Sequence, residues 1–377
     1  MNQRLARLRE KIAEAKLDAL IVTRPENLYY MSGFGGGEYL DATMIVSAAH
    51  AWISTDSRYY EEVKQTAPDF KLFQAGYDRN KVLGKLGKSK PAPKRVGFEA
   101  AHLTAATLAT WNEHARKAGF KLKPTAGIVE ELRIVKEPAE LEKMKRAVAI
   151  ADAAFAHFCR ALKPGMTERQ GAWIIEKYMR ENGADNVAFE LIVAAGPNGA
   201  LPHMRPTDRV IQRGEPIVVD IGARVDHYHS DLTRTIVLGE PDAQFDQVYN
   251  TVLAAQSAAE RQIRAGVHGK RADRFARDVI QATEWGKTFG HGLGHGVGLA
   301  VHEGPRASKL SKDTYRENMT LTVEPGIYLP GWGGVRIEDL VVIKKDGVEI
   351  LSQASKDPIR ALISRKPSCM RARFVLE

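Results

Sequence analysis

The sequence predicts an α/β (α+β) protein built from two domains. Its 377 residues are many for a single hydrophobic core. The first third alternates amphipathic helical segments with short apolar runs typical of strands, whereas the remainder contains longer helices and two similar β-hairpins. With 44% hydrophobic and 27% charged residues, the composition is that of a soluble globular protein.

The first domain is expected to span residues 1–133. Its charged N-terminus predicts an amphipathic helix that runs into a strand at 17–23. Two β-type runs joined by a short turn follow at 43–55. A further strand is predicted at 95–100 and a helix at 105–119, which together indicate a small α/β domain.

The second domain is expected at 134–356, followed by a basic tail of unknown role at 357–377. Pro138 lies just inside the start of a long amphipathic helix, a position that favours proline. Thr167 is a candidate N-cap for the next helix. Two further helical stretches separate the two hairpins described next.

The two hairpins, at 216–238 and 320–343, resemble each other. In each, an acidic residue is followed two positions later by glycine, and a second acid lies on the returning strand. The four acids are Asp220, Asp231, Glu324 and Glu338. Two related halves facing each other would bring these carboxylates into one cleft, because side chains alternate between the faces of a strand.

Charge and cysteine content exclude several classes of protein. The formal net charge is +9, but the denser basic stretch at 81–95 lacks interleaved aromatic residues, so nucleic-acid binding is not expected. Two cysteines, Cys159 and Cys369, form no disulfide framework, and Cys159 is expected to pack in a helix. With neither a long apolar run nor a signal peptide, we expect no membrane contact and a cytoplasmic location.

The four acids and His295 form a donor set suited to metal ions. Hard carboxylate oxygens with one imidazole nitrogen match a pair of divalent ions such as manganese, cobalt or zinc, and are too oxygen-rich for a structural zinc site. A single acid in a strand could instead mark a solvated edge. Four such acids with a histidine flanked by glycines favour metal, and hence a two-metal hydrolase.

Three further motifs do not match the patterns of other known kinds of site. The glycine-rich segment around His295 has neither a GxGxxG register nor a following GK[ST], so a phosphate loop is not predicted. GFGGGEY at 33–39 is interpreted as a flexible loop lining the mouth of the cleft. HEGPR at 302–306 is not HExxH, which argues against a helical zinc-protease site.

These segments carry a family resemblance. LPH, VVDIGARVDHYHSDLTRT, GHGLGHGVGLAVHEGP, TVEPGIY and VRIED resemble those of the Xaa-Pro aminopeptidase and Xaa-Pro dipeptidase (prolidase) family, the pita-bread metallopeptidases of peptidase family M24. NLYYMSGF and ISTDSRYYEE resemble the creatinase-like N-terminal domain of these enzymes. The resemblance implies a small N-terminal creatinase-like domain and a C-terminal pita-bread catalytic domain with pseudo-two-fold symmetry.

The resemblance also assigns the ligands of two divalent ions. Asp220 would chelate one ion, and Asp231 and Glu338 would bridge the pair. His295 and Glu324 would complete the shell of the other ion. A shared hydroxide would be the nucleophile, and Glu324 would also accept and pass on its proton.

Substrate-binding roles follow from the same resemblance and from side-chain chemistry. His203 and His302 would hold the substrate carbonyl and stabilise the oxyanion, with His291 at the cleft wall. Arg306 is a candidate for a peptide's C-terminal carboxylate, and Arg336 for bracing Glu338 or contacting substrate. The remaining candidates near the first hairpin are assigned no catalytic role: His227 and His229 are expected to face solvent, and Tyr228 and Thr233 flank its ligands.

The implied activity is hydrolysis of the bond between an N-terminal residue and proline, acting on Xaa-Pro dipeptides, on longer peptides with proline in second position, or on both. Manganese or cobalt is the favoured metal, with zinc possible. A homodimer is implied. The alternatives are a creatinase-like hydrolase that acts without metal and a non-catalytic peptide-binding module; a methionine aminopeptidase would not need the first 130 residues.

Overall fold

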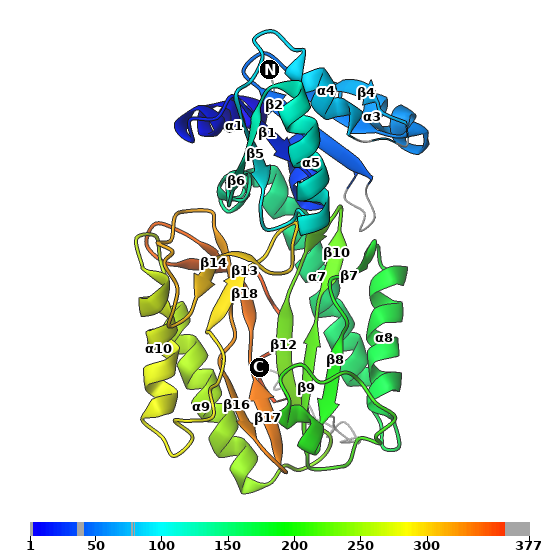
Figure 1. Ribbon diagram of the computed structural model, residues 1–377. Helices are drawn as coiled ribbons and strands as arrows, with labels where there is room; N and C mark the ends of the chain where they lie inside the picture. Colours follow the sequence, from blue (N-terminus) through cyan, green and yellow to red (C-terminus); the bar gives the residue numbers. More distant parts are fainter. Residues whose placement is uncertain (1–2, 36–40, 77, 79, 359–377) are drawn as a thin grey trace, which may run out of the picture. The chain divides into compact units, whose positions relative to one another are not determined.

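The computed structural model describes residues 3–35, 41–76, 78 and 80–358. The chain divides into two compact units, Met1–Val135 and Lys136–Glu377 (Figure 1). Most of the GFGGGEY segment and most of the basic tail lie outside the described residues. No helix in the described part of the chain is long and apolar enough to span a membrane.

The first unit is a six-stranded mixed sheet with helices. Its strand order is β4-β3-β2-β1-β5-β6. The strands are β1 (Ala19–Val22), β2 (Ala42–Ser47), β3 (Ala51–Thr55), β4 (Lys71–Gln74), β5 (Arg95–Glu99) and β6 (Lys121–Thr125). The helices are α1 (Gln3–Glu14), α2 (Pro25–Ser32), α3 (Tyr60–Thr66), α4 (Lys81–Gly87), α5 (Ala105–Ala118) and α6 (Glu130–Arg133). The helices and strands predicted in this region are confirmed.

The two edge strands of this sheet were not predicted. β6 has the sequence KLKPT and β4 the sequence KLFQ, so lysines occupy positions where an apolar run would have indicated a strand. Lysine and proline are typical of sheet edges, where one side of the backbone faces solvent. The core between sheet and helices is made by Ile21, Ile45, Val96, Phe98 and Trp111.

The second unit begins with two capped helices. α7 (Pro138–Ala161) starts at the predicted proline and carries a capping box between Glu137 and Glu140. α8 (Glu168–Glu181) starts after Thr167, whose side chain accepts a hydrogen bond from the Gln170 backbone, as predicted. Cys159 is buried in the α7 core, and burial raises the pKa of its thiol to about 12. A packing role for Cys159 is therefore confirmed.

The first hairpin is a long two-stranded ribbon with a break in its middle. β9 (Pro216–Ile221) pairs with β12 (Leu232–Val237), and β10 (Ala223–Val225) pairs with β11 (Tyr228–His229). β8 (Ile192–Ala195) and β7 (Asn186–Val187) add further strands. The same pairing register continues across the break, where Gly222 and Asp231 lie.

The second hairpin has the same construction. β15 (Thr320–Val323) pairs with β18 (Asp339–Ile343), and β16 (Gly326–Leu329) pairs with β17 (Gly333–Arg336). Val323 lies opposite Asp339 and Gly326 opposite Arg336, so one register again spans the break. That register places Glu324 opposite Glu338.

The remaining elements surround the hairpins. α9 (Ala243–Glu260) packs against β15 and β16, and α10 (Gly269–Gln281) packs against α9 (Figure 1). The short pair β13 (Gly294–Gly296) and β14 (Glu303–Ala307) lies beside β15. A 3-10 turn (Gly196–Ala200) and strand β19 (Val348–Ile350) complete the described elements of this unit, and one further 3-10 turn (Ser57–Tyr59) lies in the first unit. The two hairpins and the β13–β14 pair position the site described next.

Candidate metal centre

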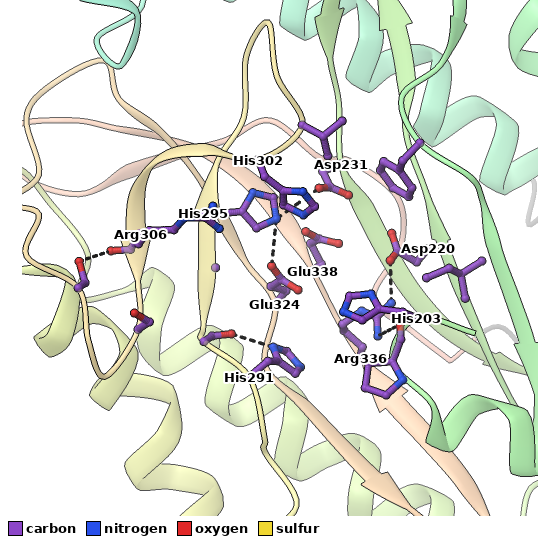
Figure 2. A pocket seen from close by; sticks show the side chains of 18 of the residues that line it. His203, Asp220, Asp231, His291, His295, His302, Arg306, Glu324, Arg336 and Glu338 are labelled. Carbon is purple, nitrogen blue, oxygen red and sulfur yellow. Dashed lines mark hydrogen bonds and ion pairs between the residues drawn. The ribbon is translucent and has the colours of Figure 1, made fainter. Parts of the chain in front are cut away.

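A single cavity in the second unit gathers every residue that the sequence singled out for chemistry. Its volume is about 810 Å³. Figure 2 shows side chains converging on it from both hairpins, from the β13–β14 pair and from the loops that carry His203 and His291. These lining residues are His203, Asp220, Asp231, His291, His295, His302, Arg306, Glu324, Arg336 and Glu338.

The four carboxylates come together because the breaks in both hairpins lie beside one cavity. Asp220 lies in β9, and Asp231 lies in the break of the same hairpin. Oxygens of Asp220, Asp231 and Glu338 all lie within 4.8 Å of one another. Glu324 and Glu338 lie in the break of the second hairpin, where the backbone is outside the regular strand pairing, and both side chains approach this cluster (Figure 2).

Burial makes this cluster electrostatically costly. Burial, reinforced by the neighbouring carboxylates, raises the pKa of both Asp231 and Glu338 well above the usual range. Burial also raises the pKa of Glu324 to about 7. Asp220 Oδ1 is buried and has no hydrogen-bond partner among the described residues. Four crowded acids, one of them with a free oxygen, fit a site that binds cations.

His295 presents a free nitrogen to these acids. Its Nδ1 lies 3.0 Å from the carbonyl oxygen of Gly296, so that nitrogen carries the proton in the neutral ring. Nε2 lies 3.4 Å from Glu324 Oε1 and 3.7 Å from Asp231 Oδ2. Burial lowers the pKa of His295 to about 3, which keeps the ring neutral. A neutral imidazole oriented by a backbone carbonyl is the usual form of a metal ligand.

The glycines around His295 are required by close packing. A Cβ atom on Gly294 would lie 1.9 Å from the carbonyl oxygen of Thr322, and one on Gly296 would lie 1.9 Å from that of Gly304. Both oxygens belong to strand backbone, so neither can give way as the end of a flexible side chain could. Glycine therefore allows β13 to run against β15 and carry His295 to the carboxylates.

The other histidines differ in their surroundings. His302 lies edge-on to His295, with ring centroids 4.4 Å apart, and burial lowers its pKa. His203 is exposed on the loop after the Gly196–Ala200 turn. His291 is held in the wall: its Nδ1 lies 2.8 Å from the Gly292 carbonyl oxygen and its Nε2 2.9 Å from the Tyr328 hydroxyl. Burial lowers the pKa of His291 to about 4.

The two arginines also occupy different environments. Arg336 is buried and donates from Nη2 to Asp220 Oδ2 at 2.7 Å and from Nε to Thr233 Oγ1 at 3.1 Å. It therefore braces Asp220 by a direct hydrogen bond and is linked to Glu338 through Thr233, whose hydroxyl donates to Glu338 Oε2 at 2.7 Å. Arg306, by contrast, is exposed on β14 at the cavity wall.

Sequence reasoning missed Tyr328, which lines the cavity. Its hydroxyl accepts from Arg336 Nη1 at 2.9 Å and contacts His291 Nε2 at the same distance. Thr322, whose hydroxyl donates to Glu324 Oε1 at 3.0 Å, was also missed. Both residues lie an even number of positions from Glu324, and strand alternation could have placed them on its face.

The expectation for the histidines near the first turn is wrong for His229. That residue is buried, and its backbone N–H and Nδ1 both lie within hydrogen-bonding distance of the Gly298 carbonyl oxygen. The turn is confined to Asp226 and His227, so His229 already belongs to β11 and is covered by the loop after β13. His227 is partly exposed, and Tyr228 bonds Glu140, away from the cavity.

Comparison with known proteins places this site in a family. Residues 142–345 match the model of metallopeptidase family M24, and residues 4–135 match the creatinase/prolidase N-terminal domain. A Xaa-Pro dipeptidase from Pyrococcus horikoshii is 34% identical over 95% of this chain and 99% of its own length.

Solved structures agree with these matches. A Xaa-Pro dipeptidase from Bacillus anthracis superposes with a TM-score of 0.90 at 36% identity, covering 94% of this chain and 98% of the other. An X-Pro aminopeptidase from Thermotoga maritima gives 0.85 at 37% identity, with 93% and 98% covered. The fold is thus a creatinase-like N-terminal domain followed by a pita-bread domain, and the chain belongs to metallopeptidase family M24.

Proposed function

We propose that this protein hydrolyses the bond between an N-terminal residue and proline, with Xaa-Pro dipeptides as its preferred substrates. The observation that carries the proposal is the meeting of four carboxylates and the free Nε2 of His295 in one cavity with exposed hydrogen-bond donors. Relatives of similar length that are named Xaa-Pro dipeptidases support the choice of substrate.

The donor set fits two divalent ions. Asp220, Asp231, His295, Glu324 and Glu338 would hold them, and the unpartnered Asp220 Oδ1 supplies a free lone pair in a buried position. Oxygen-rich ligation favours manganese or cobalt, with zinc possible. When bound, such ions act as Lewis acids and lower the pKa of water, which provides a nucleophile near neutral pH.

The protein's own residues would orient the substrate and move protons. His203 and His302, which both line the cavity, would donate hydrogen bonds to the scissile carbonyl oxygen as negative charge develops on it. Glu324 would take the proton of the attacking water and deliver it to the leaving proline nitrogen. That delivery matters because an Xaa-Pro bond is a tertiary amide whose nitrogen has no proton of its own.

Arg306 would recognise the far end of a dipeptide. Its guanidinium is exposed at the cavity wall, whereas the Arg306 backbone N–H is already bound to Asp313 Oδ2 at 2.7 Å. An arginine whose backbone is fixed and whose head group is accessible can bind a free carboxylate with two parallel hydrogen bonds. A dipeptide places its carboxylate on the proline itself, so Arg306 would favour dipeptides over longer chains.

The proposal is tested by steady-state rates on Leu-Pro, Leu-Pro-Pro and Leu-Ala, with manganese or cobalt added after chelation. We expect hydrolysis of Leu-Pro that depends on metal, slower hydrolysis of Leu-Pro-Pro, and little of Leu-Ala. Equal rates on the two proline peptides would overturn the dipeptide preference. Hydrolysis of a C–N bond that persists in chelator would favour a creatinase-like enzyme, and peptide binding without turnover would favour a binding module.

Two further expectations complete the proposal. We expect a homodimer, which light scattering on the purified protein would detect. We also expect a cytoplasmic location, where short proline peptides from protein turnover would be available; cell fractionation tests this expectation.

A further inference from the structure

Behind the cavity, Arg234 occupies a fully buried position on β12. Among the residues that the structure describes, it is the largest fully buried side chain, with 1% of its surface exposed. Its neighbours Thr233 and Thr235 bond to residues at the cavity, whereas Arg234 points to the opposite face of the strand. Arg234 does not line the cavity.

The guanidinium of Arg234 ties three segments together. Nη1 donates to the backbone carbonyls of Thr233, at 2.9 Å, and of Glu338. Nη2 donates to Asp339 Oδ1 at 2.7 Å and to the Ala354 carbonyl oxygen at 2.8 Å. One side chain thus joins the first hairpin, the second hairpin and the segment after β19.

This junction coincides with the seam between the two hairpins. β12 and β18 belong to different sheets, yet the backbone N–H of Glu338 donates to the Thr233 carbonyl oxygen at 3.0 Å. On the cavity side the Thr233 hydroxyl donates to Glu338 Oε2. On the opposite face, Arg234 donates hydrogen bonds to the backbone carbonyls of the same two residues. The position of Glu338 relative to the first hairpin is therefore fixed from both faces.

Asp339 completes the arrangement on the rear face. It is fully buried and directly follows Glu338. The two adjacent acids therefore lie on opposite faces, Glu338 toward the cavity and Asp339 toward Arg234. Lys356 Nζ lies 2.5 Å from Asp339 Oδ2 and 3.1 Å from Glu260 Oε2. Removing either partner of the Arg234–Asp339 pair would leave a buried charge poorly compensated, which forces the local structure to rearrange.

We propose that Arg234 and Asp339 are a positioning pair that sets the distance between the carboxylates of the two hairpins, so that both hairpins bind the same pair of metal ions. This inference rests on the proposed function, because it assumes that the cavity carboxylates are metal ligands. Neither residue touches the cavity, so their effect on metal binding passes through Glu338 and Thr233.

The test measures binding of Mn²⁺ alone by isothermal titration calorimetry, with the full chain, well below the unfolding midpoint of each variant. Wild type is compared with Arg234→Met, Arg234→Lys and Asp339→Asn. We expect Arg234→Met and Asp339→Asn to bind at least one Mn²⁺ about 10- to 100-fold more weakly, the usual effect of losing a group that orients a metal ligand. Arg234→Lys should recover part of the loss, and high Mn²⁺ should restore Leu-Pro turnover.

The matched control is Arg209→Met, which breaks a two-pronged ion pair with Glu215 at 2.6 Å without touching the cavity lining. It should lower the unfolding midpoint but leave Mn²⁺ affinity unchanged. Folded Arg234→Met or Asp339→Asn with wild-type affinity would overturn the positioning role. If Arg234→Met does not fold, Arg234→Lys and Asp339→Asn decide. Wild type that binds no Mn²⁺ would overturn the proposed function itself.

Discussion

The two hairpins carry the same number of acids to the cavity but place them differently. In the first, Asp220 stays within the paired strand β9 while Asp231 lies in the break. In the second, both Glu324 and Glu338 lie in the break, opposite each other. Two acids directly opposite would repel within a regular ladder. The longer glutamate side chains and the irregular backbone let both reach the cavity.

The hairpins also differ in how their acids are braced. Asp220 is held by Arg336, whereas Glu338 and Glu324 are held by the hydroxyls of Thr233 and Thr322. A charged donor fixes the orientation of a carboxylate more strongly than a hydroxyl does. Asp220 is therefore the acid whose orientation a charged donor fixes, whereas burial and neighbouring carboxylates raise the pKa of Asp231 in the first hairpin and of Glu338 in the second, so both hairpins need cations for full ionisation.

The largest expected loss of metal binding and activity comes from two single variants, each of which neutralises one acid of one hairpin. Asp231→Asn and Glu338→Gln keep the shape of the side chain but remove its negative charge. Each should abolish binding of the two metal ions. Each should also lower kcat/KM by far more than about 100-fold, which is the upper end of the effect of losing a group that only orients a metal ligand. Metal content and Leu-Pro turnover check this. Asp208→Asn, at an exposed ion pair with Arg169, is the control and should behave as wild type. Retention of metal and activity in either variant would mean that one hairpin suffices.

A smaller effect should separate the braces of the two hairpins. Tyr328→Phe removes one acceptor of Arg336 Nη1 and the partner of His291, whereas Thr233→Val removes the acceptor of Arg336 Nε together with the hydroxyl that donates to Glu338. Each should lower kcat/KM about 10- to 100-fold. Mn²⁺ affinity should fall in Thr233→Val and remain near wild type in Tyr328→Phe.

The control for these two variants is Tyr228→Phe, whose hydroxyl donates to Glu140 outside the cavity. It should cost about 1–3 kcal/mol of stability, as loss of a buried partner does, without changing kcat/KM. Equal loss of activity in Tyr228→Phe and Tyr328→Phe would show that the effect arises from stability rather than from the wall of the site.

The smallest expected effect concerns pH and the rear of the second hairpin. Burial and the nearby Asp339 raise the pKa of Glu260 from 4.5 to about 7. The folded state then holds this proton more tightly than the unfolded state does, so stability falls as pH rises from about 4.5 to about 7. Glu260→Gln removes this contribution, which amounts to at most about 3 kcal/mol.

Urea unfolding at pH 5, 6 and 7 in chelator measures this dependence. The loss of stability between pH 5 and 7 should be smaller in Glu260→Gln than in wild type. Glu317→Gln, at an exposed position, should retain the wild-type dependence. Parallel curves for wild type and Glu260→Gln would mean that Lys356 keeps Glu260 ionised throughout this range.

The sequence alone singled out the acids that the structure brings together around one cavity, because acids in apolar strands are chemically conspicuous. Asp220, Glu324 and Glu338 stand in apolar runs typical of buried strands, Asp231 follows Asp220 on the returning side of the first hairpin, and the glycines around His295 indicate close approach. The same pattern predicted both hairpins and the capped starts of α7 and α8. These features depend on local spacing, which a single sequence displays directly.

What the sequence could not supply depends on contacts between distant segments. Tyr328 resembles any strand tyrosine until His291, 37 positions away, lies beside it. Arg234 resembles a surface residue of a strand until Asp339 and the Ala354 carbonyl surround it. His229 seemed to lie at an exposed turn because the loop carrying Gly298 is remote in sequence. Such partners are set by tertiary packing rather than by periodicity.

The tight turn of the first hairpin limits which insertions and deletions its two strands can accept. Asp226 and His227 both adopt positive φ, at 48° and 69°, as a two-residue turn requires. Because side chains alternate along a strand, adding or deleting one residue on one side of this turn would move Asp231 to the outer face and detach it from Asp220. Viable loop variants selected from a random library at this turn should therefore preserve the pairing of Ile221 with Leu232, with extra residues confined to the loop itself.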